Sequence, residues 1–118
     1  GMDEVSPLGT THVVEIRDGA AREWTIDPSR HGFPIGSAEE LGGGPPAENA
    51  GAVLAVMENR APATATAAVV LNAAAALYVS NGGPADFGDA ISAARKGLED
   101  GAGARALERL RRAYAARP

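Results

Sequence analysis

The stretch from Ala63 to Val79 contains no charged residue and is apolar on nearly every side of a helix. A helix of this kind is usually buried, because none of its faces is suited to contact with water. Asn81-Gly82-Gly83-Pro84 follows, a combination that predicts a firm end to the helix. A fully buried helix needs neighbours all around it, and this need is the strongest constraint on how the chain can fold.

The rest of the chain has few bulky side chains with which to surround such a helix. Of its 118 residues, 26 are alanine and only 22 are Leu, Ile, Val or Phe. Burying an alanine removes little apolar area from water, so hydrophobic stabilisation is weak for a chain of this length. We therefore expect one helix-rich domain with a thin core that needs a partner surface.

Two segments near the N-terminus alternate in the way that β-strands do. In the first, Val13, Glu15 and Arg17 share one face, and His12, Val14 and Ile16 share the other. In the second, from Arg22 to Asp27, Trp24 and Ile26 lie on one face. The simplest interpretation of Trp24 is a core anchor for the strand that carries it.

The residues between these segments predict an antiparallel hairpin over residues 11–27. Asp18-Gly19 is a strong turn signal, because glycine adopts positive φ at little cost. We therefore assign Gly19 a structural role in the turn. Asp27-Pro28 ends the second strand, since proline cannot continue the ladder of hydrogen bonds.

After the hairpin the sequence predicts four helices, over residues 45–59, 63–79, 85–98 and 103–116. Pro45 and Pro46 suit the first turn of a helix, where the missing N–H costs nothing. Asn59 suits a left-handed stop. The predicted fold class is α+β, with the hairpin first and about four helices after it, in a single domain that spans residues 1–118.

Composition and charge exclude several classes of function. The chain has no cysteine, which rules out disulfides, thiolate zinc sites and cysteine nucleophiles. No apolar run approaches the ~20 residues of a membrane span, and the N-terminus lacks the pattern of a signal peptide, so we expect a cytoplasmic protein without membrane contacts. Residues 1–60 carry 10 acidic and 4 basic groups, and residues 61–118 carry 5 and 7. The resulting balance of +2 in the second half is too small to indicate a nucleic-acid partner.

Two positions invite a chemical interpretation, and each has a simpler alternative. Asp3-Glu4 is an adjacent acidic pair, and two hard carboxylates can hold Mg²⁺ together with waters and substrate phosphates. The dipeptide alone favours a solvated chain end instead. Asn72 lies in the middle of the apolar helix, where a buried amide must find partners. It could bind a ligand, but such a residue more often ties the backbone of a neighbouring loop, so we assign it a structural role.

Other candidates carry less weight. His12 and His31 lie 19 residues apart without a third ligand in view, so surface or core positions are favoured. The glycines at 42–44 precede a helix, as in a phosphate cradle, but they lack the Lys-Ser/Thr of a P-loop, and two prolines follow directly. No nucleophile and base are placed together by any motif, so the sequence predicts no catalytic residue.

Several segments form a larger pattern. They are Gly1-Met2-Asp3-Glu4-Val5-Ser6, Val13-Val14-Glu15-Ile16-Arg17-Asp18-Gly19, Asp27-Pro28 with Gly32, Leu41 with Gly43-Gly44, Glu48-Asn49-Ala50, and the run from Leu71 to Val79. Their order and spacing along nearly the whole chain resemble the C-terminal part of anthranilate phosphoribosyltransferase. Where that family usually has aspartate after its two glycines, this chain has Pro45, which we expect to alter the helix entry rather than the chemistry.

This resemblance implies a reaction, a metal and a fold. In the family, anthranilate displaces pyrophosphate from phosphoribosyl pyrophosphate during tryptophan biosynthesis. Asp3 and Glu4 match the family's acidic pair, which coordinates Mg²⁺ at the pyrophosphate. The implied fold is the C-terminal part of the nucleoside phosphorylase/phosphoribosyltransferase-type α/β domain, so residues 1–118 are expected to form a single incomplete domain.

The resemblance also implies what this chain lacks. The family's glycine-rich diphosphate loop, its lysine-histidine-glycine segment, its anthranilate-binding residues and its dimer-forming N-terminal domain all precede the acidic pair. Because a metal pair without a substrate cradle cannot position a displacement, we expect no transferase activity from this chain alone.

Three hypotheses follow for the function. The first is the C-terminal piece of an anthranilate phosphoribosyltransferase. The second is a non-catalytic module that uses the same unit to self-associate or to dock on a companion chain. The third and weakest is a related nucleoside phosphorylase or a nucleic-acid-binding relative. The expected partner is the N-terminal part of the enzyme or a second copy of the chain, in dimers or higher oligomers that cover the helix over residues 63–79.

Overall fold

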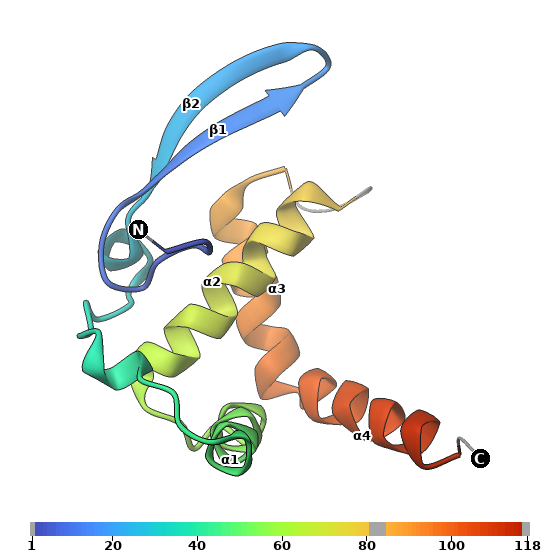
Figure 1. The fold of residues 1–118 in the computed structure, drawn as a ribbon. Helices are drawn as coiled ribbons and strands as arrows, with labels where there is room; N and C mark the ends of the chain where they lie inside the picture. The colour runs from blue at the N-terminus through green and yellow to red at the C-terminus, as the bar shows by residue number, and fades with distance from the viewer. Residues whose placement is uncertain (1, 81–84, 117–118) are drawn as a thin grey trace.

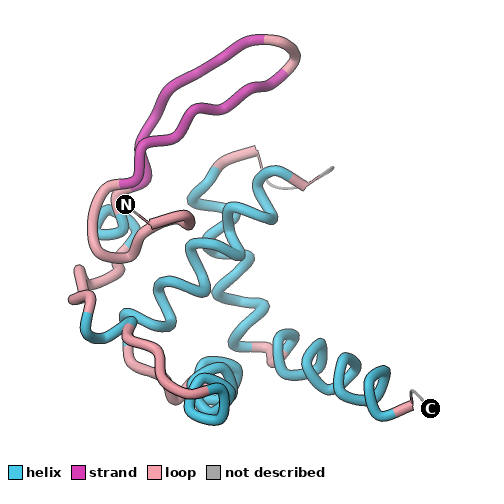
Figure 2. Tube along the Cα trace, viewed as in Figure 1, coloured by secondary structure: helices cyan, strands magenta, loops and turns pink. Residues whose placement is uncertain are grey.

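A computed structural model describes residues 2–80 and 85–116, and it has the predicted α+β order of a hairpin followed by helices (Figure 1). The elements are β1 (Thr11–Arg17), β2 (Ala20–Ile26), two short 3₁₀ turns η1 (Pro28–His31) and η2 (Glu39–Leu41), and the helices α1 (Pro46–Met57), α2 (Ala63–Val79), α3 (Phe87–Glu99) and α4 (Ala102–Ala115). Figure 2 shows that the strands of the described chain are confined to the hairpin. The predicted stop at residues 81–84 lies outside the described residues.

The hairpin forms around the predicted turn. Asp18 and Gly19 both adopt positive φ, at 52° and 78°, which is the conformation that a two-residue hairpin turn requires. This turn pairs Val13 with Trp24 and Glu15 with Arg22. These four side chains therefore share the face of the hairpin that points toward the helices.

The helix boundaries follow from local capping. Pro45 and Pro46 lie at the start of α1, and Asn59, at φ 56°, follows its end as predicted. Helix α3 starts two residues later than expected because Asp86 is its N-cap, and the Asp86 carboxylate accepts hydrogen bonds from the amides of Gly88 (2.7 Å) and Asp89 (3.3 Å). An N-cap side chain satisfies amides that the first turn of a helix leaves without partners.

The core lies between α2 and α3, which cross at the centre of the molecule (Figure 1). Its largest fully buried side chain is Leu71, at 0% exposure. The aromatic rings of Trp24, Tyr78 and Phe87 meet edge to face, with centroids 5.4 to 5.8 Å apart. Among the described residues, thirteen hydrophobic ones are buried, and four of these are alanines on the two crossing helices: Ala67, Ala74, Ala90 and Ala94. Small side chains let the two helices approach closely, at the cost of a thin core.

One side of α2 is incompletely covered within the described chain. Val69 is 37% exposed and Leu77 is 36% exposed. Together with small residues of α3 they line an apolar groove of about 510 Å³; its lining residues are Met57, Val69, Val70, Ala73, Ala76, Leu77, Ala93, Ala94, Gly97, Leu98 and Gly103. The chain therefore does not enclose its most apolar helix by itself.

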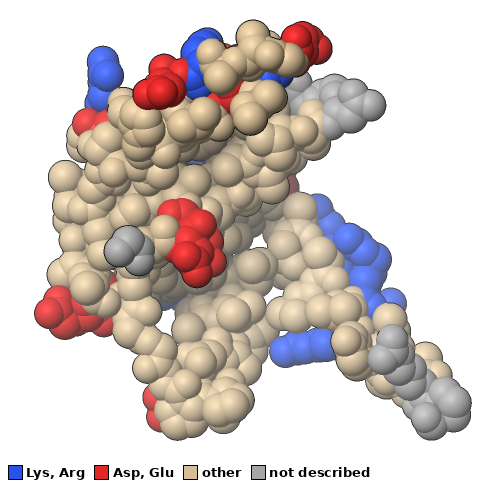
Figure 3. All heavy atoms as spheres, turned by 45° about the horizontal axis from the view of Figure 1, so that its top comes forward, with Lys and Arg blue, Asp and Glu red and all other residues tan. Residues whose placement is uncertain are grey.

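Helix α4 projects from the body of the molecule (Figure 1). It has no fully buried residue, and Leu110 on its apolar stripe is 54% exposed. Basic side chains gather along this projecting arm in the space-filling view (Figure 3). Among the described helices, none is both long and apolar enough to cross a lipid bilayer.

Candidate metal site

The acidic pair lies on the segment that leads into β1. Asp3 and Glu4 are both exposed, and neither carboxylate has a hydrogen-bond or ion-pair partner among the described residues. Two carboxylates are thus presented to solvent with their oxygen atoms available. This availability is what a metal ligand requires, although a solvated chain end would share it.

The residues that follow the pair are held firmly, which a frayed chain end would not be. Both backbone groups of Val5 bond to the Asn72 side chain on α2: the Val5 amide donates to Oδ1 (2.9 Å) and Nδ2 donates to the Val5 carbonyl (3.0 Å). The Ser6 amide donates to the Thr11 Oγ1 atom (3.0 Å). Pro7 is among the most completely buried side chains. Glu4 therefore directly precedes an anchored residue, Val5, and Asp3 lies one position before Glu4.

A shallow cavity of about 560 Å³ adjoins this segment, and it is rich in oxygen atoms. It is lined by Met2, Glu4, Ser6, Leu8, Thr10, Thr11 and His12. Carboxylates and hydroxyls are hard donors suited to Mg²⁺, which usually takes only one or two protein carboxylates and completes its shell with waters and phosphates. Within residues 2–80 and 85–116, no three His, Cys, Asp or Glu side chains gather into a complete metal cage. Glu4 lines this cavity and Asp3 does not, so the described residues offer the one or two carboxylates that a magnesium ion takes from a protein and do not offer the ligand set of a structural metal.

The other residues considered from the sequence lie apart from this segment or have structural partners. The His12 ring contacts the Glu23 carboxylate (3.2 Å) on the outer face of the hairpin, whereas the His31 ring lies against Phe87, far along the chain. In the glycine stretch, Gly44 exchanges two hydrogen bonds with the Asn49 side chain at the start of α1. The amide and the carbonyl of Gly44 are therefore both occupied by Asn49, so this amide is not available to bind a phosphate.

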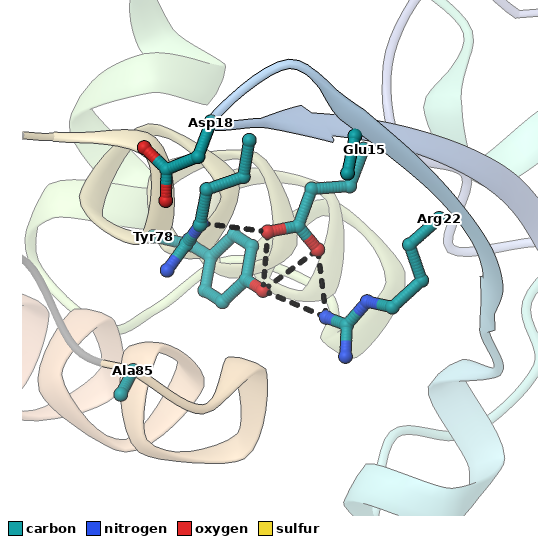
Figure 4. Close-up of a pocket in the computed structure, with 7 residues that line it drawn as sticks. Glu15, Asp18, Arg22, Tyr78 and Ala85 are labelled. Atoms are coloured by element: carbon teal, nitrogen blue, oxygen red, sulfur yellow. Dashed lines mark hydrogen bonds and ion pairs between the residues drawn. The ribbon is translucent and has the colours of Figure 1, made fainter.

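A polar cluster beneath the hairpin was not predicted (Figure 4). The Tyr78 hydroxyl on α2 donates to the Glu15 carboxylate (3.0 and 3.1 Å), which also accepts from Arg22 Nη2 (2.7 Å) and pairs with Arg17 Nε (3.0 Å). The Arg17 guanidinium lies 5.4 Å from the centre of the Tyr78 ring. The available signal was a glutamate on the strand face that also carries Val13, directly opposite an arginine. This cluster fastens the hairpin to α2.

Protonation of Glu15 should loosen this fastening. The hydrogen bond from Arg22 is the main cause that lowers the pKa of Glu15 below its ordinary 4.5, and the Tyr78 hydroxyl and the charge of Arg17 act in the same direction. Because the folded-state pKa is the lower one, the cluster stabilises the fold above pH 4.5, and this stability is lost as the pH falls through the folded-state pKa.

We therefore expect Glu15→Gln to lower the urea midpoint at neutral pH and to lose this effect progressively in acid. The matched control is Glu23→Gln on the outer face of the same hairpin, whose side chain is 70% exposed. It should change the midpoint little at any pH, because exposed ion pairs contribute little to stability. A difference between wild type and Glu15→Gln that stays constant with pH would contradict this assignment.

The sequence of this chain is similar to a known family and to several known enzymes. Residues 1–104 match the family described as "Glycosyl transferase family, a/b domain". The chain is 41% identical over 111 residues to the anthranilate phosphoribosyltransferase of Methylobacterium nodulans, a match that covers 93% of this chain and 32% of the relative. It is 41% identical over 116 residues to the enzyme of that name from Anaeromyxobacter dehalogenans strain 2CP-C, covering 98% and 33%. The enzyme of that name from Methylorubrum extorquens strain PA1 is 37% identical over 110 residues, covering 93% and 32%. The chain spans about a third of the length of the curated relatives that it matches.

Proposed function

The chain belongs to the glycosyl transferase family with an α/β domain, and from this membership we propose that it acts as the C-terminal part of an anthranilate phosphoribosyltransferase. The reaction transfers phosphoribosyl from phosphoribosyl pyrophosphate to anthranilate and releases pyrophosphate. The proposal is carried by one observation: similarity to enzymes of that name runs along 93% or more of this chain.

Within such an enzyme, Asp3 and Glu4 would hold Mg²⁺ at the pyrophosphate of the substrate. Bound magnesium supplies neutralisation of the negative charge that builds on a departing pyrophosphate. The two carboxylates contribute ligand oxygens, and the anchored backbone that follows them keeps the pair at the surface. No residue of this chain is assigned as a nucleophile, acid or base.

The preceding part of the enzyme is expected to be necessary for activity. Asp3 and Glu4 can hold a metal, but the described residues offer no cradle that would orient both substrates for an in-line displacement. We expect no phosphoribosyl transfer by the 118-residue chain alone. We expect measurable transfer by a chimaera in which this chain replaces the matched third of the Methylobacterium nodulans enzyme.

A phosphoribosyl-transfer assay on both proteins tests the proposal. Turnover by the isolated chain would refute the need for a partner, and a folded chimaera without turnover would refute the assignment of this chain to the enzyme.

The apolar groove along α2 and α3 is the surface through which we propose that the preceding part docks. The chain spans a third of its relatives, and the exposed Val69 and Leu77 mark the side of α2 that this chain leaves bare. Without that partner, a second copy is expected to cover the groove.

The same groove is the observation that favours the alternative function, a stand-alone module for oligomerisation or docking. Light scattering on the isolated chain should therefore detect dimers or larger species. A monodisperse monomer at high concentration would count against the alternative function and against self-association through the groove.

A further inference from the structure

We propose that Asn72 is a positioning residue for the acidic pair, so that α2 sets where Asp3 and Glu4 present their carboxylates. The inference rests on the proposed metal role of Asp3 and Glu4. It adds to that role a residue that lies 67 positions away from Val5 in the sequence.

The contact has the form of a clamp rather than a single hydrogen bond. Asn72 accepts from the Val5 amide (2.9 Å) and donates to the Val5 carbonyl (3.0 Å), so both polar backbone groups of the residue after Glu4 bond to the same side chain. Two bonds to one residue restrict its rotation as well as its position. The backbone that leaves Glu4 is therefore held in one orientation.

The Asn72 amide is itself held by its own helix. Its Nδ2 atom also donates to the Ala68 carbonyl one turn earlier (2.8 Å). Both of the donor hydrogens of the amide and its acceptor oxygen are thus engaged, which leaves one orientation of the amide that satisfies all three contacts. Asn72 is half-buried, and its helix also carries the fully buried Leu71, so the clamp is attached to a helix that is anchored in the core.

Metal ligands bind best when their geometry is fixed before the ion arrives. Asp3 and Glu4 are exposed and have no partner of their own among the described residues, so nothing on their side chains holds them in place. Fixing the backbone at Val5 reduces the conformational freedom that the segment loses when a metal binds. A clamp of this kind acts on metal affinity and not only on folding.

A residue that positions the acidic pair changes metal affinity, whereas a residue that only stabilises the fold does not. Mn²⁺ titration of the isotope-labelled chain separates these two roles. In the wild type, paramagnetic broadening at low Mn²⁺ should be strongest at the amide signals of residues 2–5 and should extend to residues 10–12, which line the same cavity as Glu4. Asn72→Ala introduces a side chain that suits an alanine-rich helix, and it removes both hydrogen bonds to Val5. We expect it to weaken Mn²⁺ binding about tenfold, in the range found when a residue that orients a ligand is removed, and to speed hydrogen exchange at the Val5 amide.

Thr64→Val is the matched control. Thr64 is a buried residue of the same helix, and its hydroxyl donates to Glu40 in the short turn η2, which lies on the loop before α1. The variant therefore loses one contact between α2 and a loop without touching residues 3–5. It should lower stability while leaving Mn²⁺ affinity unchanged. If Asn72→Ala does not fold, Asn72→Leu removes the same hydrogen bonds and keeps the side-chain volume.

The outcomes are distinct. A tenfold loss in Asn72→Ala with none in Thr64→Val supports the inference. Unchanged Mn²⁺ affinity with fast exchange at Val5 overturns it and leaves the metal role of the acidic pair intact. An absence of localised broadening in the wild type overturns both the inference and the proposed metal role.

Discussion

Replacing Leu71 by alanine is expected to lower the free energy of unfolding by about 3 kcal/mol, in the range measured for fully buried leucines in well-packed cores. Leu71 is 0% exposed and belongs to the cluster of buried residues to which α2 and α3 contribute most of the members. Four of the thirteen buried hydrophobic residues are alanines, so few large neighbours are present to close the cavity. A domain of ordinary stability has only about 5–15 kcal/mol to lose, and a thin core places this chain toward the lower end.

Leu77→Ala is the matched control for this prediction, because it makes the same substitution on the same helix at a side chain that is 36% exposed. At protein concentrations low enough for the chain to be monomeric by light scattering, it should cost roughly 1 kcal/mol or less. Urea denaturation followed by circular dichroism measures both variants. Equal losses in the two would mean that the groove side of α2 is as well packed as the crossing with α3, which would contradict the described core.

Asp3→Asn in the chimaeric enzyme is expected to reduce kcat/KM by at least about 100-fold, because a metal ion at a departing pyrophosphate contributes several kcal/mol of transition-state stabilisation. The substitution preserves the size of the side chain and removes one negative ligand. Raising the Mg²⁺ concentration should restore part of the activity, since the remaining carboxylate still binds the metal, although more weakly than the intact pair does. A loss of folding would not be recovered in this way.

Glu99→Gln at the end of α3 supplies the charge-matched control for that measurement. It also removes one exposed carboxylate, at the far end of the helix from the N-terminal segment. We expect its kcat/KM to stay within about twofold of the parent chimaera, consistent with the small effects of surface substitutions. Parent-like activity in both Asp3→Asn and Glu4→Gln would exclude the pair as magnesium ligands.

The hairpin and the helix limits could be predicted because their causes are local. Asp18-Gly19 is sufficient for a tight turn, and Pro45, Pro46 and Asn59 affect only the residues beside them. The helix limits differ from prediction by at most two residues, at the end of α1 and at the start of α3. The difference at α3 was local too: Asp86 is an N-cap, and the predicted start at 85 did not take its side chain into account.

The candidate metal site could be predicted only in part. Adjacent carboxylates and the family resemblance indicate Asp3 and Glu4 from the sequence. The partner of the following backbone could not be derived, because alternation and helical periodicity say nothing about which loop a helix will meet. An asparagine in an apolar helix predicts that some partner exists, and the fold supplies Val5.

The cluster of Glu15, Arg22 and Tyr78 could be predicted even less, because local sequence patterns do not show which distant residues will meet. Strand alternation places Glu15 on the face shared with Val13, but a carboxylate there is an exception to the usual pattern of buried faces. The Glu15 carboxylate is tolerated on this face because it accepts a hydrogen bond from Tyr78, which lies 63 residues later in the chain. Only the packing of the hairpin over the end of α2 brings these groups together.

The sequence by itself determined the elements, their order, the acidic pair and the thinness of the core, because each depends on residue type and short spacing. The tertiary structure decided which face of α2 is enclosed, where the bare groove lies, and which side chains clamp the N-terminal segment and the hairpin. Those features depend on the angle and separation at which helices and strands pack, and contacts between residues more than 60 positions apart arise from that packing rather than from any local pattern.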